Sequence, residues 1–349
     1  FEIKNKKVFT DLSELTLKWS ITDNGTVIEK GEIKDIKTAP GGTKQLEIPY
    51  KSDNFNGEGI LTLSYCTKNK TAYCEKGYEI SFDQFILKAM PKIETPKKND
   101  KLDFVRIGTT VNISGNGFSV KIIDGAINSL CYDKKEYLSK PIKPDFFRAL
   151  VDNDFAKLNF MPFLTDISPY YVWRAATDTA QGKVENATEG ENGEIIINVS
   201  WQVLSFEKVK SKYVIYPDGS INIHLEGTPK MQKLLRFGIK MALPKALNNV
   251  KWYGRGPHET YCDRKTGGKI ALHTAKVSEL EEEYMRPQGN GNRTDIRFVE
   301  LTDDSGIGLR FTAPSKTPLQ FQAKNYTENA LDRATHTHLL KREDTIYFN

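Results

Sequence analysis

Hydrophobic and polar residues alternate along most of this chain with the two-residue period of β-strands. Near the start, Leu15, Leu17, Trp19 and Ile21 share one face, and the run ends at Asp23-Asn24-Gly25, a strong hairpin signal. The alternation recurs at Leu61, Leu63 and Tyr65, and at Ile80 and Phe82. Short strands separated by turns predict one small antiparallel sandwich of the immunoglobulin type over residues 1–88.

A second, longer series of strands follows a polar segment. Residues 90–101, M-P-K-I-E-T-P-K-K-N-D-K, offer almost nothing to bury, so we predict a linker over residues 89–101. Beyond it, Pro217-Asp218-Gly219 and Asp303-Asp304-Ser305-Gly306 predict two hairpin turns. His224 falls on the polar face of the strand after the first of these turns. Alternating runs elsewhere are Phe118–Ile122, Ile195–Trp201 and Leu319–Gln322.

The predicted fold class is therefore all-β, with a large sandwich over residues 102–349. Only 145–155 and 279–285 suggest short helical turns, and no repeat of 20 to 50 residues indicates a propeller or solenoid.

Composition narrows the class of protein without naming a function. The 50 basic and 45 acidic residues leave a net charge of +5, mixed along the chain, which does not indicate a nucleic-acid partner. No apolar run approaches the roughly 20 residues that span a bilayer, so no membrane partner is expected. The cysteines, at 66, 74, 131 and 262, form no C-x-x-C pair, and free thiols are preferred over a Cys66–Cys74 disulfide.

One dense stretch, residues 251–264, reads K-W-Y-G-R-G-P-H-E-T-Y-C-D-R. Gly254, Gly256 and Pro257 suggest that it is a shaped loop, not a plain strand or helix. Such a loop would either let its polar side chains satisfy one another or present them for a site.

A second dense stretch, residues 144–154, reads P-D-F-F-R-A-L-V-D-N-D. Asp152, Asn153 and Asp154 supply several side-chain oxygens, suited to Ca²⁺ or to a polyol, with Arg148 four positions before Asp152. The alternative is a turn in which these residues cap their own backbone while Arg148 pairs with a carboxylate.

Other motifs give weaker evidence for a functional site. The G-N-G triplets at 115–117 and 289–291 lack the strand-to-helix setting of a phosphate loop and predict turns. His336 and His338, two apart, have no third metal ligand nearby in sequence, so we expect a paired surface or cleft role. No motif names a nucleophile.

The two dense stretches also carry a family resemblance. Residues 144–154 resemble the P-x-F-W-R-A-P-T-D-N-D signature of lac-operon-type β-galactosidases, glycoside hydrolase family 2, with Phe147 for Trp and Leu150-Val151 for Pro-Thr. Residues 252–264 are similar to that family's W-Y-G-x-G-P-x-E-N-Y-x-D-R. Weaker matches lie at 114–118, 236–241 and 335–340, and residues 73–85 resemble the family's immunoglobulin-like fourth domain.

The resemblance implies an immunoglobulin-like β-sandwich followed by a large galactose-mutarotase-like supersandwich. Because the chain starts at Phe1 without Met, we expect a piece of a longer enzyme whose TIM barrel lies upstream. The family's acid/base and nucleophile glutamates, its divalent cation (Mg or Ca) and its Na would belong to that barrel, so no cofactor and no catalytic residue is expected here. The family's sugar-stacking Trp, in a G-x-D-x-S-W-G segment, is expected beyond residue 349.

The resemblance therefore predicts a non-catalytic, C-terminal part of an enzyme that hydrolyses terminal β-D-galactosides with retention. Its partners would be the upstream barrel and a β-galactoside or oligosaccharide, and the full enzyme could form a homo-oligomer. A bacterial origin leaves periplasm and cytoplasm open. Residues expected to line or organise the sugar cleft are Arg148, Asp152, Asn153, Asp154, Tyr253, Arg255, His258, Glu259 and Asp263. Alternatives are a stand-alone carbohydrate-binding module and, from the supersandwich alone, an aldose epimerase.

Overall fold

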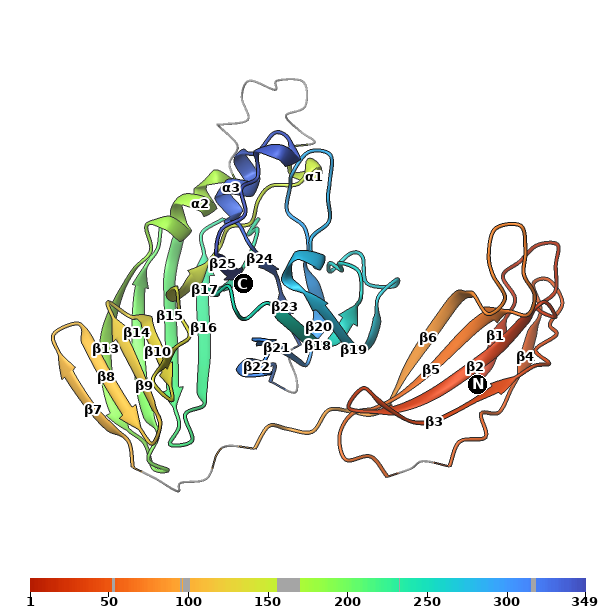
Figure 1. Ribbon diagram of the computed structural model, residues 1–349, viewed down its shortest axis with the longest axis horizontal. Coiled ribbons are helices and arrows are strands. Elements are labelled where there is room, and N and C mark those ends of the chain that lie inside the picture. Colours follow the sequence, from red (N-terminus) through yellow and green to blue (C-terminus); the bar gives the residue numbers. More distant parts are fainter. Residues whose placement is uncertain (52–53, 95, 97–100, 156–169, 232, 315–317) are drawn as a thin grey trace.

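The computed structural model describes residues 1–349 except 52–53, 95, 97–100, 156–169, 232 and 315–317. Two β-rich units follow one another along the chain, a slender N-terminal unit and a larger C-terminal unit (Figure 1). Every strand pairing among the described residues is antiparallel, which confirms the predicted all-β sandwich class. The domain boundaries stay a prediction, because residues 95 and 97–100 of the predicted linker lie outside the described residues.

The N-terminal unit is built on a four-stranded sheet of order β3-β2-β5-β6 and a two-stranded sheet of β1 and β4. The strands are β1 Glu2–Lys4, β2 Leu15–Asp23, β3 Thr26–Ile33, β4 Thr43–Gln45, β5 Gly59–Thr67 and β6 Glu79–Lys88. The four apolar side chains predicted to share a face of β2 are buried together. Asn24 and Gly25, both at positive φ, make the predicted hairpin turn between β2 and β3.

One predicted alternation in this unit is wrong. Phe82 is half-buried, whereas Ile80 is 49% exposed. The ladder between β5 and β6 shifts register here, because Cys66 pairs with Glu79 and Tyr65 pairs with Ser81. Ile80 is the extra residue of this bulge, and a bulged residue is displaced from the regular alternation of faces.

The C-terminal unit begins with a nine-stranded sheet of order β24-β25-β17-β12-β10-β9-β8-β7, with β11 paired to β10. Its strands are β7 Asp103–Ile107, β8 Thr110–Gly115, β9 Phe118–Ile123, β10 Ala126–Tyr132, β11 Lys135–Glu136, β12 Lys140–Asp145, β17 Gly238–Pro244, β24 Ala323–Lys324 and β25 Thr345–Phe348. A four-stranded sheet packs against it and contains β13 Gln181–Glu189, β14 Ile195–Gln202, β15 Phe206–Ile215 and β16 Ile221–Pro229. His224 of β16 is exposed, as its polar face predicts.

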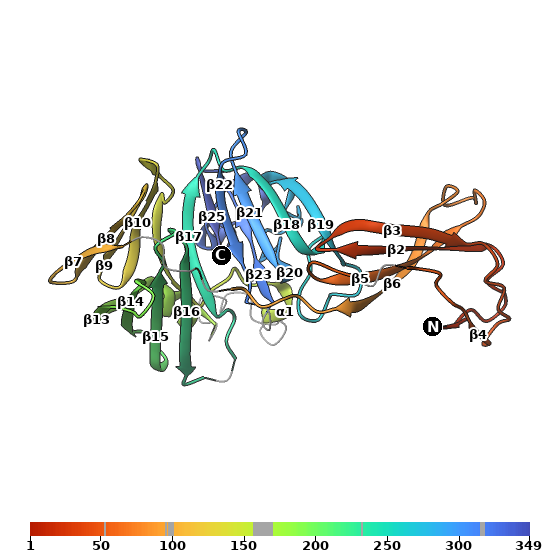
Figure 2. The same ribbon diagram turned by 90° about the horizontal axis from the view of Figure 1, so that it is seen from below.

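A further four-stranded sheet of order β19-β18-β21-β22 lies between the β7–β10 strands and the N-terminal unit (Figure 2). Its strands are β18 Asn249–Gly256, β19 Lys269–Lys276, β21 Phe298–Thr302 and β22 Gly308–Thr312, and β20 Arg293–Ile296 pairs with β23 Leu319–Phe321 nearby. One continuous hydrophobic core, with Trp173 and Trp252 among its largest buried side chains, joins these sheets.

The prediction that residues 251–264 form a loop is wrong in its first half. Residues 249–256 are strand β18, which pairs with β19 along its whole length and with β21 over residues 249–253. The glycines serve close packing rather than a turn. A Cβ at Gly254 would lie 2.5 Å from Cδ1 of Ile296, and one at Gly256 would lie 2.9 Å from the rings of Trp252 and His273. The loop begins only at Pro257, whose peptide bond with Gly256 is cis.

Two helices, α2 Tyr171–Asp178 and α3 Glu328–Arg333, were not predicted from the sequence, while α1 Asp152–Phe155 lies inside the predicted turn at 145–155. At 279–285 the only helical element is a 3₁₀ turn, Val277–Glu279, displaced from the prediction. Helices this short are marginal on their own and owe their stability to packing. Trp173 and Ala176 of α2 are fully buried, and the Thr327 hydroxyl caps α3 by accepting from Ala330 N–H. Among the described residues, no helix is long and apolar enough to cross a membrane.

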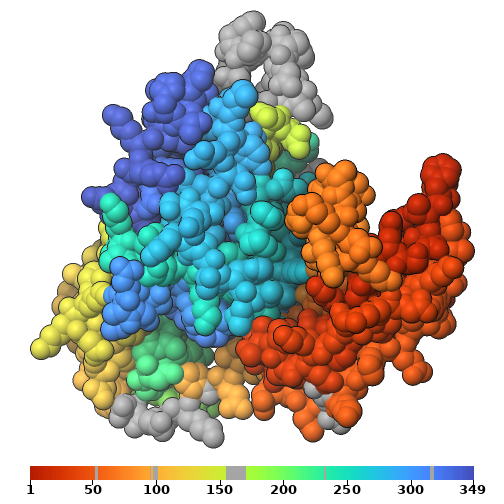
Figure 3. All heavy atoms as spheres, turned by 45° about the vertical axis from the view of Figure 1, so that its right-hand side comes forward, coloured from red at the N-terminus to blue at the C-terminus, as the bar shows by residue number. Residues whose placement is uncertain are grey.

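The two units touch along one side (Figure 3), and a buried polar cluster lies at their contact. Glu58, 3% exposed, accepts hydrogen bonds from Arg297 at 2.7 and 2.9 Å and from the Tyr253 hydroxyl at 2.7 Å. We call these three residues the Glu58 cluster. Nearby, the Gln84 side chain exchanges two hydrogen bonds with the backbone of Ile270. Buried, charge-assisted hydrogen bonds of this kind hold the units in one orientation.

Candidate functional site

The two dense stretches of sequence meet through a third segment, residues 280–293. Gln288 and Asp152 exchange two hydrogen bonds: Asp152 N–H donates to Gln288 Oε1 at 3.1 Å, and Gln288 Nε2 donates to Asp152 Oδ2 at 3.3 Å. On its other side the segment contacts Glu259 through the Tyr284 hydroxyl and the backbone N–H of Gly291. Stretches more than 90 residues apart in sequence are thereby brought to one place.

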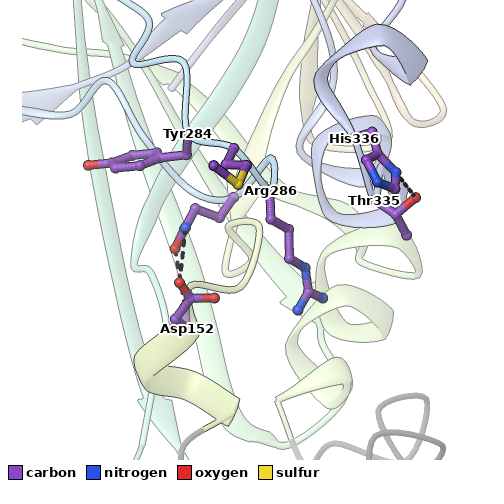
Figure 4. Close-up of a pocket in the computed structure, with 7 residues that line it drawn as sticks. Asp152, Tyr284, Arg286, Thr335 and His336 are labelled. Atoms are coloured by element: carbon purple, nitrogen blue, oxygen red, sulfur yellow. Dashed lines mark hydrogen bonds between the residues drawn. The ribbon is translucent and has the colours of Figure 1, made fainter.

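A pocket of about 440 Å³ opens at this meeting point. Figure 4 shows Asp152 and Arg286 along one side, with Thr335 and His336 facing them from a separate segment. The lining residues are Asp152, Tyr284, Met285, Arg286, Gln288, Thr335 and His336. The lining therefore combines a carboxylate, a guanidinium, an amide, a hydroxyl and an imidazole with the apolar Met285 side chain.

Such a lining suits a ligand that carries several hydroxyl groups. Each hydroxyl both donates and accepts, so it can donate to Asp152 and accept from Arg286 or Gln288. Asp152 is the one carboxylate in the lining within the described part of the chain. Retaining glycosidases use two carboxyl groups roughly 5–5.5 Å apart, whereas the described lining offers one.

Arg148 and Asp154 lie behind the pocket wall. The Arg148 guanidinium donates to both carboxylate oxygens of Asp154, at 2.7 and 3.2 Å, and also to the carbonyl of Ala149 at 3.0 Å. Asp154 additionally accepts from Val151 N–H at 2.8 Å. This pair stabilises the turn that presents Asp152. Asn153 is exposed on α1 beside it.

The oxygen-rich run 152–154 does not converge on a point where a cation could sit. Asp154 is turned towards Arg148, while Asp152 is turned towards Gln288. Among the described residues, no three His, Cys, Asp or Glu side chains are gathered as a metal site requires. Of the readings that the sequence left open, the geometry matches the capping turn, with Asp152 available to a polyol.

Glu259 is a buried carboxylate whose oxygens are occupied by protein donors. It accepts from Arg264 at 2.7 Å, from Gly291 N–H at 2.8 Å, from Tyr261 at 3.3 Å and from Tyr284. We call Glu259 with these four donors the Glu259 cluster. Burial, together with the negative charge of Glu259, raises the pKa of both tyrosines. The cluster therefore joins loop 257–264 to the 280–293 segment.

Arg293 is a second buried anchor of the same segment. Its guanidinium lies over the Trp252 ring and donates to the backbone carbonyls of Leu280, Gly291 and Pro257 at 2.8 to 2.9 Å. Burial lowers the pKa of this guanidinium. The Arg293 side chain thus connects the backbone at Leu280, Gly291 and Pro257.

The other predicted residues lie away from the pocket. Tyr253 belongs to the Glu58 cluster between the units, where burial and the Glu58 carboxylate raise the pKa of its hydroxyl. Arg255 donates to Asp295 at 2.5 Å and to two backbone carbonyls of loop 265–268. His258 and Asp263 are exposed on loop 257–264.

Sequence reasoning missed most of the pocket lining. Irregular backbone with no periodic pattern carries Tyr284, Met285, Arg286 and Gln288, and the following Gly289–Gly291 pattern predicts only a turn. His336 was expected on a surface or in a cleft, and it does line the pocket, with its ring 5.6 Å from that of His338. The four cysteines are free, as preferred.

The fold and the pocket define an all-β, two-unit protein with a pocket in its larger unit. A family model described as "Beta galactosidase small chain" matches residues 114–349, and one described as "Beta-galactosidase, domain 4" matches residues 1–88. The chain belongs to the β-galactosidase small-chain family.

Curated relatives agree with this assignment. The β-galactosidase of Priestia megaterium is 31% identical over 99% of this chain, and that of Halalkalibacterium halodurans is 28% identical over 97%. The β-galactosidase of Streptococcus thermophilus is 26% identical over 99%. The chain spans about a third of the length of each of these relatives, 33% in all three cases.

Proposed function

We propose that this chain is the non-catalytic, C-terminal part of a β-galactosidase and forms one wall of its sugar-binding cleft. Family membership supports the enzyme class. The observation that carries the cleft-wall role is the pocket at the meeting point of the two motif stretches, which offers hydroxyl-binding groups with a single carboxylate.

The bond-breaking groups of this proposal belong to the part of the relatives that this chain does not span. There, two carboxylates on a TIM barrel would hydrolyse terminal β-D-galactosides with retention, one as acid/base and one as nucleophile. The same part would bind Mg²⁺ or Ca²⁺ and Na⁺, and the full enzyme would assemble as a homo-oligomer. The role left to this chain is to support the barrel and to orient the sugar through Asp152, Arg286 and Gln288.

A complementation experiment tests this proposal. The purified chain is assayed with a nitrophenyl β-D-galactoside, alone and after co-expression with the remaining two-thirds of the Priestia megaterium relative. We expect no hydrolysis by the chain alone and measurable hydrolysis by the pair. Turnover by the chain alone would refute the non-catalytic role.

A stand-alone carbohydrate-binding module is the second candidate, and one observation favours it: the described lining of the pocket already brings several hydroxyl-binding groups together. Calorimetric titration of the purified chain with galactose and with a β-galactan separates the two. Binding by the chain alone, with no gain in activity when the other two-thirds is supplied, would favour the module.

A further inference from the structure

We propose that helix α3 is a strut that sets the distance between the two walls of the pocket, with Glu328 and Asp332 as positioning residues. This inference rests on the proposed sugar-contacting role of the pocket. How α3 holds residues 149–152 can nevertheless be tested without a sugar.

Four consecutive backbone N–H groups lead into the pocket wall, and each donates to a side-chain oxygen. Ala149 N–H donates to Glu328 at 2.7 Å and Leu150 N–H donates to Asp332 at 3.0 Å. Val151 and Asp152 N–H then donate to Asp154 and Gln288. Because Ala149 and Leu150 are almost fully buried, these N–H groups depend on α3 for their acceptors.

The two acceptors are spaced four apart on α3 and therefore lie on the same face of the helix. Each is also an ion-pair partner. The Lys324 ammonium lies 2.8 Å from Glu328, with the Arg236 guanidinium at 3.8 Å, while Arg174 of α2 contacts Asp332. Hydrogen bonds to a charged acceptor are roughly twice as strong as neutral ones, so the wall is held firmly.

The same helix continues directly into the opposite wall. Arg333, the last residue of α3, is followed by Ala334, Thr335 and His336, and the last two line the pocket. The helix is fixed beneath the first wall by packing of Leu331 against Ala149 and Tyr326. One short element therefore contacts the Asp152 wall through its carboxylates and carries the His336 wall at its end.

This arrangement has a mechanical consequence. If Asp332 loses its contact with Leu150, α3 no longer fixes the distance between the wall that carries Asp152 and the wall that carries His336. Side chains from the two walls that contact the same ligand are then no longer held at a fixed distance. A displacement of about 1 Å is enough to weaken binding or reaction.

Hydrogen–deuterium exchange on the full 349-residue chain tests the strut. In Asp332→Ala we expect exchange of residues 149–152 to accelerate at least about tenfold, because a buried N–H loses its charged acceptor. Asp332→Asn keeps an oxygen for Leu150 but loses the charge that pairs with Arg174, so it should fall between wild type and Asp332→Ala. Arg333→Ala, an exposed change on the same helix, is the matched control and should leave exchange unchanged. If Asp332→Ala does not fold, Asp332→Asn and Glu328→Gln carry the test.

A parallel titration with galactose links the strut to the site. We expect Asp332→Ala to weaken galactose binding about tenfold and Arg333→Ala to leave it unchanged. Unchanged exchange at residues 149–152 in the Asp332 variants would overturn the strut, as would an effect of equal size in Arg333→Ala. Accelerated exchange at residues 149–152, together with no galactose binding by the complemented pair, would support the strut and count against the cleft-wall function.

Discussion

Two carboxylates of this protein come from equally recognisable motifs and have opposite surroundings. Glu259 is 2% exposed, and four protein donors surround its oxygens. Asp152 is exposed in the pocket, where its side chain accepts one hydrogen bond of 3.3 Å from Gln288. A carboxylate whose oxygens are already occupied serves the fold, whereas one that faces a pocket can still receive a ligand.

The contrast teaches that a motif locates a region but does not assign roles within it. The Glu58 cluster extends the comparison, because it too encloses a carboxylate, here between the two units. If enclosure by donors is what separates the roles, then enclosed carboxylates should matter for stability and Asp152 for binding.

The largest effect is expected at Glu58. Glu58→Ala leaves the buried Arg297 guanidinium without a counter-charge, and breaking such a pair destabilises a protein by about 4 kcal/mol. Chemical denaturation followed by tryptophan fluorescence measures the loss. Glu32→Ala, an exposed residue of β3 whose ion pair with Lys34 lies on the surface, is a comparison variant and should change stability far less. A loss below about 1 kcal/mol for Glu58→Ala would contradict the importance of enclosure.

A somewhat smaller loss is expected at Glu259, because its cationic partner Arg264 is 59% exposed and can be rehydrated. Glu259→Ala should destabilise the chain by about 3 kcal/mol, since Gly291 N–H and the Tyr284 hydroxyl lose their acceptor. Glu259→Gln retains one acceptor oxygen and should cost less. The same denaturation experiment applies, and equal losses in the two variants would argue against the hydrogen-bond account.

Acid should weaken the α3 region selectively. Burial alone would raise the pKa of Glu328, but Lys324, Arg236 and Ala149 N–H together lower it from 4.5 to about 2. The lowered pKa means that the unfolded chain binds the proton first, so this stability is present above pH 4.5 and is lost as pH falls towards 2. In this window the slope should be about 1.4 kcal/mol per pH unit steeper in wild type than in Glu328→Gln. Parallel stability–pH curves for the two proteins would refute the prediction.

The smallest stability effect belongs to Asp152. Asp152→Asn should change the free energy of unfolding by less than about 0.5 kcal/mol, because the side chain is exposed. Galactose affinity should nevertheless fall about tenfold, since a charged acceptor for hydroxyls is lost. Calorimetry and denaturation on the same preparation measure both quantities. A stability loss comparable to that of Glu259→Ala would erase the contrast between the two carboxylates.

Much of the fold was predictable from local pattern. The alternation in β2 and β14 and the turns at Asn24-Gly25 and Pro217–Gly219 specify strands and hairpins, because a period of two and a positive-φ turn are properties of neighbouring residues. The helices α2 and α3 could not be predicted from the sequence. Their eight and six residues carry too little periodicity to indicate a helix that tertiary packing stabilises. Gly254 was misread for a related reason: what requires a glycine there is Ile296, more than forty residues away.

The sequence by itself determined the all-β class, the main hairpins and the family, since each depends on residue order over a short range. Tertiary structure alone decided which polar residues share a site. The pocket residues Asp152, Gln288 and His336 come from three separate segments. Tyr253 lies away from these residues, at the contact between the two units. The physical reason is that a carboxylate's role follows from the donors around it and its access to solvent, and both are supplied by segments distant in sequence.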